Sequence, residues 1–146
     1  METRAIQHIN LLQGPTSPFF MNQNENPGVS IVSKTLNGDN YHSWSRAMAM
    51  SLKSKNKLQF IDGSLLKPSI EDSNFVYWDR GNTLVVFWLI QSIDPSIAQS
   101  ILWMETALQI WEDLRERSYQ GDVFHITELL AQIYTYKQGD LSIGAY

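Results

Sequence analysis

A series of apolar stripes at helical spacing constrains this chain more than any other feature of its sequence. In the first stripe, Tyr41, Trp44, Met48 and Leu52 recur every three or four residues, which places their side chains on one face of an α-helix. Similar stripes predict four further helices, which begin near residues 72, 95, 107 and 122. Helices with one apolar face bury it against one another. The sequence therefore predicts an all-α fold, a compact bundle of about five helices.

Capping residues mark several of the expected helix boundaries. Residues 39–40 (Asp-Asn) can cap the first helix, and Asp94 followed by Pro95 predicts the start of a short third helix, because Asp caps well and Pro is tolerated in the first turn. Thr106 and Gln109 have the spacing of a capping box, in which each side chain satisfies one unpaired amide. We expect this box to begin the fourth helix.

The end of the chain predicts a helical hairpin. Gly121 is expected to end the fourth helix, and Asp122 to cap a fifth helix that runs to Gln138. Helices joined by so few residues lie as antiparallel neighbours. Residues 141–142 (Leu-Ser) resemble the cap of a sixth helix, so we expect the domain to be truncated at its C-terminal end. The stripe of the fifth helix consists of Ile126, Leu129, Leu130, Ile133 and Tyr136.

The N-terminal part has no helical period. Residues 1–28 mix Asn, Gln, Ser, Pro and Gly and predict a flexible leader, which leaves residues 29–146 as the helical domain. Within the leader, residues 18–21 (Pro-Phe-Phe-Met) can pack on their own domain, which we favour, or in a neighbour's groove. Residues 29–35 are rich in β-branched side chains and predict a short extended segment, either a hairpin arm or a lead-in to the first helix.

Composition excludes several classes of function. The 146 residues include no Cys, which excludes a disulfide framework, a thiolate zinc site and a zinc knuckle within them. The longest apolar run, residues 84–90, is far shorter than the ~20 residues of a membrane span. The net charge of -4 is the wrong sign for binding a phosphate backbone. We expect no membrane partner, and we rank direct RNA binding last.

The one basic cluster has two readings. Lys53, Lys55 and Lys57 lie near the predicted end of the first helix, where the helix macrodipole favours cations. We prefer this structural role over a contact with RNA.

No set of residues has the spacing of a catalytic or metal site. His8, His42 and His125 are far apart in the sequence, and no nucleotide-binding motif occurs. The acidic pair Glu112 and Asp113 lies at i, i+3 and i+4 spacings from Arg115 and Arg117, as on an exposed, salt-bridged helix face. We therefore expect no catalytic, cofactor-binding or metal-binding residue, no small-molecule substrate and no enzymatic activity.

The five Trp residues divide into two groups. Trp103 lies near the predicted end of the third helix, and we assign it to a possible interface, because such surfaces favour Trp. The others lie on or beside the predicted buried stripes and are expected to be core residues: Trp44, Trp78, Trp88 and Trp111.

Several segments, taken together and in order, resemble the N-terminal Gag region of plant Copia-type (Ty1/copia-like) retrotransposons, from about residue 26 onward. They are residues 36–48 (LNGDNYHSWSRAM), 55–64 (KNKLQFIDGS), 94–101 (DPSIAQSI), 106–122 (TALQIWEDLRERSYQGD) and 137–146 (KQGDLSIGAY). Residues 121–126 (GDVFHI) depart from the family, which commonly has a basic segment there. The positions that match the family motifs are Tyr41, Trp44, Phe60, Asp62, Gly63, Trp78, Ile110, Trp111 and Leu114.

The resemblance implies a function. Gag regions of this kind are helical, capsid-like, non-enzymatic modules, and their copies assemble around the element's RNA. It implies that the motif positions form the fold and that the partner is another Gag copy. RNA would be contacted only indirectly, through regions absent from this chain. We also expect the protein to be cytoplasmic. The alternative is a domesticated or degenerate remnant that acts as a host protein-protein adaptor. No cofactor is implied.

Overall fold

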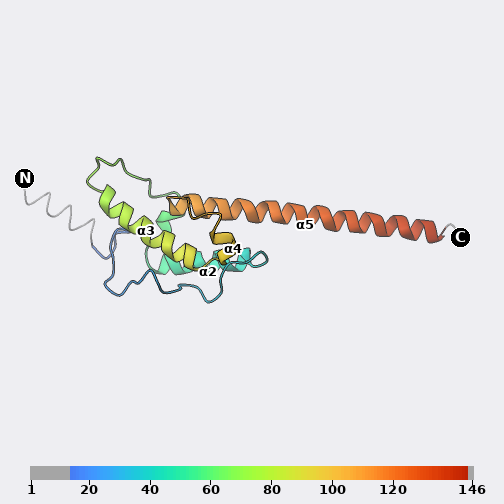
Figure 1. The fold of residues 1–146 in the computed structure, drawn as a ribbon, viewed down its shortest axis with the longest axis horizontal. Coiled ribbons are helices and arrows are strands. Elements are labelled where there is room, and N and C mark those ends of the chain that lie inside the picture. Colours follow the sequence, from blue (N-terminus) through green and yellow to red (C-terminus); the bar gives the residue numbers. More distant parts are fainter. Residues whose placement is uncertain (1–13, 145–146) are drawn as a thin grey trace, which may run out of the picture. The chain divides into compact units, whose positions relative to one another are not determined.

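The computed structural model describes residues 14–144, and side chains as far as residue 139. His8 and the rest of residues 1–13 lie outside the described residues. Over the part described, the secondary structure is helical and includes no β-strand (Figure 1). Its elements are α2 (Tyr41–Ser54), the 3₁₀-helix η1 (Leu58–Phe60), α3 (Phe75–Gln91), α4 (Pro95–Ala98) and α5 (Ala107–Gly144).

Helix α2 forms where its stripe predicts it and buries Trp44, Met48 and Leu52. The residue before it, Asn40, takes the N-cap position without capping the helix through its side chain. Its Oδ1 instead accepts a hydrogen bond from the Asn37 amide at 2.8 Å, and its Nδ2 donates to the Thr35 carbonyl at 2.8 Å. Asn40 therefore ties the lead-in segment to the start of α2.

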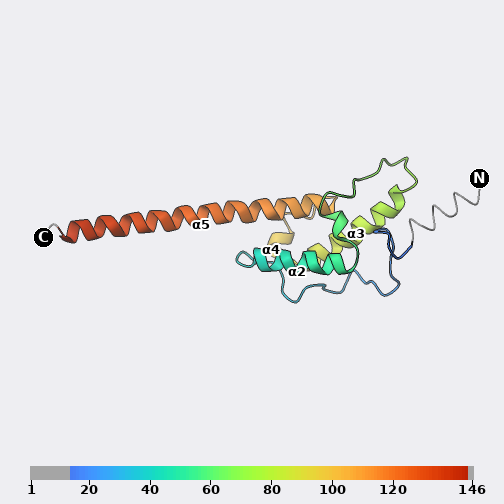
Figure 2. The same cartoon turned by 180° about the vertical axis from the view of Figure 1, so that it is seen from behind.

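Helix α3 is the central element of the first part of the chain. It begins two to three residues later than expected, and its buried residues include polar Asn82 and Gly81 as well as large apolar side chains. The short helix η1 contacts both α2 and α3, and Figures 1 and 2 show the labelled helices α2 and α3 beside each other. The core is therefore formed where η1 joins α2 to α3.

Helix α4 is shorter than predicted and ends at Ala98. Pro95 occupies its first turn as expected, but the Asp94 side chain does not cap the helix. Its Oδ1 accepts a hydrogen bond from the Thr35 hydroxyl at 2.7 Å. The cap is lost because this carboxylate binds the lead-in segment instead.

The capping box that begins α5 is confirmed. The Gln109 amide donates to the Thr106 hydroxyl oxygen at 3.1 Å, and the Thr106 amide donates to Gln109 Oε1 at 3.4 Å.

The predicted helical hairpin is wrong. Gly121, Gly139 and residues 141–142 all lie inside α5, which is continuous from Ala107 to Gly144. Glycine permits a left-handed end but does not impose one, no Pro follows to interrupt the helix, and each added residue extends the hydrogen-bonded ladder. The compact bundle of about five helices is therefore not confirmed, since residues 14–144 form four α-helices and the 3₁₀-helix η1. The chain divides into two units, Met1–Trp111 and Glu112–Tyr146, and the second unit is described by α5 alone.

The lead-in segment forms no strand. Residues 31–34 are bends, and the only pairing in the described lead-in is an isolated parallel bridge between Leu36 and Ile93. No helix within residues 14–144 has both the length and the apolar content that crossing a membrane demands.

The continuity of α5 can be tested at Gly121. A Cβ at this position would meet no atom within 4 Å, so Gly121→Ala should increase helix content and stabilise α5 by about 1 kcal/mol, because Gly is that much poorer than Ala in a helix interior. Circular dichroism during thermal unfolding measures both effects.

The matched control is Gly63→Ala, at a glycine with φ +83°, where any side chain is strained. This variant should lose stability. If Gly121→Ala also lost stability, or lost helix content, the chain would turn at residue 121.

Candidate functional site

The motif residue Trp44 binds a buried backbone carbonyl. The Ser92 carbonyl oxygen accepts two hydrogen bonds, from the Leu36 amide at 2.8 Å and from Trp44 Nε1 at 2.9 Å. The Asp94 amide then donates to the Leu36 carbonyl at 2.9 Å. Leu36, Trp44 and Ser92 are all buried. Trp44 therefore holds the start of α2 to the end of α3 and does not face a ligand.

A second contact forms around Phe60. Its ring lies against Gly81 of α3, where an added Cβ would overlap the ring, since Phe60 Cε1 and Cε2 are 3.0 Å from that position and Cζ is closer still. Both residues are buried. The helical conformation at position 81 does not require glycine. Glycine is needed there because the Phe60 ring leaves no room for a side chain.

Asp62 and Gly63 shape the turn that follows. The Asp62 Oδ1 atom accepts a hydrogen bond from the Ser64 amide at 2.8 Å, and Gly63 has a φ of +83°, which side chains disfavour. Both are exposed. Their role here is to reverse the chain after Ile61, which is buried.

Trp78 is nearly covered by its neighbours. Its ring is buried, with the Lys67 ammonium 5.7 Å and the Phe75 ring 6.1 Å from its centroid. A cation over an indole face is attracted by the ring quadrupole. The loop before α3 is thus fastened to the first turns of that helix.

The last motif lies in the first turns of α5. Ile110 and Leu114 are buried, and the Trp111 ring lies 5.8 Å from that of Trp44. Sequence reasoning missed Asn82, whose Nδ2 donates to the Glu105 carbonyl at 2.8 Å and whose Oδ1 accepts from the Ala107 amide at 2.9 Å. A lone Asn in an apolar stretch was the available signal, because buried amides need partners.

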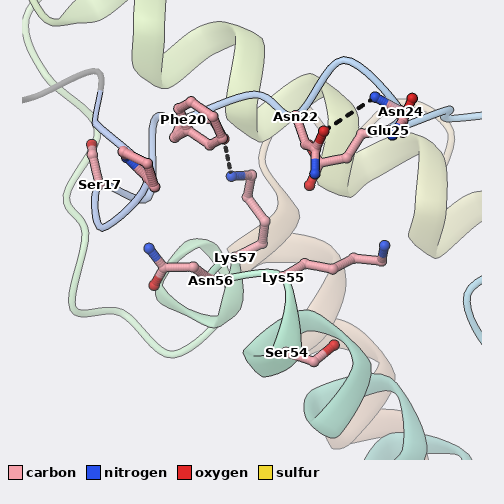
Figure 3. Close-up of a pocket in the computed structure, with 10 residues that line it drawn as sticks. Ser17, Phe20, Asn22, Asn24, Glu25, Ser54, Lys55, Asn56 and Lys57 are labelled. Carbon is pink, nitrogen blue, oxygen red and sulfur yellow. Dashed lines mark hydrogen bonds between the residues drawn. The ribbon is translucent and has the colours of Figure 1, made fainter.

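A cavity of about 410 Å³ opens between the leader and the end of α2 (Figure 3). Lys57 is its most buried side chain, and the Lys57 ammonium donates to the Phe20 carbonyl at 2.6 Å. Asn56 Nδ2 donates to the Thr16 carbonyl at 3.0 Å. The remaining lining residues are Pro15, Ser17, Asn22, Asn24, Glu25, Ser54 and Lys55.

These contacts give the basic cluster a structural role. Burial lowers the pKa of Lys57 below its ordinary value of 10.5, while Glu25 opposes and Lys55 adds to that effect. The Lys55 ammonium lies 5.3 Å from the centroid of the Trp88 ring, and Trp88 Nε1 donates to the Asn26 carbonyl at 3.2 Å. Lys57, Asn56 and Trp88 therefore hold residues 16–26 onto the rest of the first unit.

The leader also packs through an aromatic contact. The rings of Phe19 and Tyr77 lie 6.5 Å apart. The segment of residues 18–21 thus contacts its own domain, as we favoured from the sequence.

The second unit exposes a row of large apolar side chains along α5. Its members, which we call the α5 apolar face, are between 43% and 71% exposed: Tyr119, Val123, Ile126, Leu129, Leu130, Ile133 and Tyr136. One turn earlier, Arg117 Nε lies 2.6 Å from Asp113 Oδ2, which confirms the salt-bridged character expected for residues 112–117. Monomeric proteins rarely leave a contiguous apolar face uncovered without an interaction that uses it.

Trp103 is a second exposed apolar side chain. It is 74% exposed beside Leu102 at 59%, and its Nε1 atom donates to the Ser100 carbonyl at 2.9 Å. The ring is therefore available to a partner, whereas the other Trp residues named above are buried or half-buried.

No group of three or more His, Cys, Asp and Glu side chains that could hold a metal ion occurs within the described residues. Most of the motif residues placed above are buried in the core, and Asp62 and Gly63 shape a turn. The arrangement is that of a helical domain whose buried motif residues form its core, with exposed apolar side chains on α5 and at Trp103.

Comparison with known families agrees with this class of protein. Residues 22–69 match the family model described as the Gag-polypeptide of LTR copia-type. Residues 22–69 are therefore similar to a Copia-type retrotransposon Gag region, as the motifs in this segment predicted, and the Gag family is a structural, non-enzymatic module. The match includes Trp44 and Phe60 and ends before Trp78; a plant origin stays a prediction. Neither a curated protein nor a solved structure matched the chain.

The contact between Phe60 and Gly81 gives a direct test of the packing role. Gly81→Ala should destabilise the first unit by about 1–3 kcal/mol, the usual cost of overpacking a core, because its Cβ would overlap the Phe60 ring. Urea unfolding followed by Trp fluorescence measures the loss. Gly38→Ala is the control, since nothing lies within 4 Å of its Cβ.

The double variant Phe60→Leu with Gly81→Ala should be more stable than additivity of the single variants predicts, because a smaller side chain leaves room for the methyl group. Strict additivity would mean that the two positions do not compete for space.

Lys57 gives a pH-dependent test. Because burial lowers its pKa in the folded protein, the unfolded chain binds more protons between that lowered pKa and 10.5, and the free energy of unfolding rises with pH across this window. Below the window the full cost of burying the ammonium is present.

Lys57→Met removes this dependence. The free energy of unfolding of the wild type, minus that of Lys57→Met, should therefore grow as pH rises from neutrality toward 10.5. Urea unfolding of both proteins in the same buffers measures the difference, so that other titrating groups cancel. A difference that stays flat or falls with pH contradicts the role given to Lys57.

Proposed function

We propose that this protein is a non-enzymatic structural subunit of a Copia-type retrotransposon, a Gag module that associates with copies of itself. The match of residues 22–69 to the copia-type Gag family carries the proposal. The exposed α5 apolar face supports it, because a subunit that assembles must present surface that folding leaves uncovered.

The packing of the motif residues supports a role without catalysis. Catalytic groups need mutual reach within a pocket, whereas Trp44 and Phe60 are buried and Asp62 binds a backbone amide in its own turn. Lys57, the buried ammonium, donates to a backbone carbonyl. These side chains are occupied by the fold.

RNA binding belongs, in this proposal, to other parts of the polyprotein. A net charge of -4 opposes the counterion release that drives binding to a phosphate backbone. Lys55 and Lys57, the core of the basic cluster, face Trp88 and the leader. An assembly of this module would therefore enclose RNA without binding it directly.

A second candidate function is an adaptor that binds a partner protein. The 74% exposure of Trp103 favours it, because Trp is enriched in binding surfaces.

The experiment that separates these functions is sedimentation of the purified chain over a range of concentrations. A Gag subunit should shift from monomer to higher oligomers as concentration rises, and Trp103→Ala should leave that shift unchanged. A protein that stays strictly monomeric at the highest attainable concentration and low salt contradicts the proposal and favours the adaptor. Tight RNA binding with a steep salt dependence would contradict the role assigned to other regions.

A further inference from the structure

The α5 apolar face has the spacing of a coiled-coil seam. Tyr119, Val123, Ile126, Leu130 and Ile133 alternate steps of four and three residues, which is the spacing of positions a and d in a heptad. At about 100° per residue, these side chains with Leu129 and Tyr136 fall within an arc of roughly 140°. The whole face is exposed.

We propose that this face binds the same face of a second copy of the chain, with the two α5 helices antiparallel. The inference rests on the proposed function, since it names the surface through which the Gag module associates. In this pairing Val123 lies opposite Ile133, and Ile126 lies opposite Leu130, so that the central apolar side chains of one helix meet those of the other.

The size of the face fits a second copy. Seven large side chains, each at least 43% exposed, offer on the order of 100 Å² apiece when covered by a neighbouring helix. The total approaches the roughly 800 Å² per partner of a standard stable interface. A face that repeats over about five helical turns matches another helix of the same length, and a copy of α5 supplies one.

Charge selects the antiparallel direction. Between residues 119 and 137, the charged side chains within the arc are Asp122 near one end and Lys137 at the other. In the antiparallel pairing, Lys137 lies opposite Tyr119 and within about 4.5 Å along the axis of the partner copy's Asp122, at 1.5 Å per residue. A parallel pair would place Asp122 beside Asp122 and Lys137 beside Lys137, which is destabilising.

Disulfide cross-linking tests the proposal without background, because the chain has no Cys of its own. A mixture of Val123→Cys and Ile133→Cys chains should form a covalent heterodimer under mild oxidation. Val123→Cys alone should not, since the thiols introduced at this position in the two copies would be separated by ten residues, about 15 Å along the axis. Thr135→Cys, on the opposite side of α5, is the control that should stay monomeric.

The outcomes separate the surface from the function. Ready cross-linking of Val123→Cys with itself would overturn the antiparallel arrangement in favour of a parallel one. Ile126→Glu, at an exposed position that should leave the first unit folded, should reduce the association constant at least tenfold. If the wild type oligomerises and Ile126→Glu does so equally well, the module self-associates through another surface and this inference fails alone. If the wild type is strictly monomeric, the proposed function fails as well.

Discussion

The first unit depends on the carbonyl of Ser92 and its two donors. This oxygen is buried at the end of α3, and it is shared by the Leu36 amide and the Trp44 indole. A buried polar group without a partner costs about 1–3 kcal/mol, so loss of these bonds would be costly. The same bonds fix the positions of the lead-in, α2 and the end of α3. A Phe at position 44 would fill much of the same volume without a donor. The requirement for Trp therefore comes from hydrogen bonding as much as from packing.

The stripes of apolar residues predicted α2 and α3 because periodicity reports which face of a helix is buried. It does not report what that face meets. The Phe60 ring on Gly81 and the Asn82 amide that binds the start of α5 are relations between residues more than twenty positions apart, and neither partner carries a local signal of the other. The same limit explains Asn40 and Asp94, which stand at cap positions yet bind the lead-in segment. Local chemistry predicted that these side chains would accept hydrogen bonds, but not from which donor.

The error at Gly121 has a different origin. Glycine, an acidic residue and a renewed apolar stripe are equally compatible with a turn between two helices and with one long helix that has an apolar face. The stripe requires only that something cover it. A hairpin would cover it from within the chain, whereas a continuous α5 leaves it exposed. A second copy of the chain could cover the exposed stripe as a hairpin would, so both arrangements are compatible with the same sequence pattern.

The segment that matches the Gag family and the α5 apolar face thus lie in different parts of the chain. Residues 22–69, which match the copia-type Gag family, supply Trp44, Phe60 and the turn at Gly63, and all of them serve the core or the chain reversal of the first unit. The α5 apolar face lies outside that match, in the second unit. Changes on this face would leave the buried contacts of the first unit intact, so the fold and the family motifs could persist without the association that we propose for α5. The match therefore shows similarity to a Gag region, whereas the self-association that we propose depends on the surface of α5.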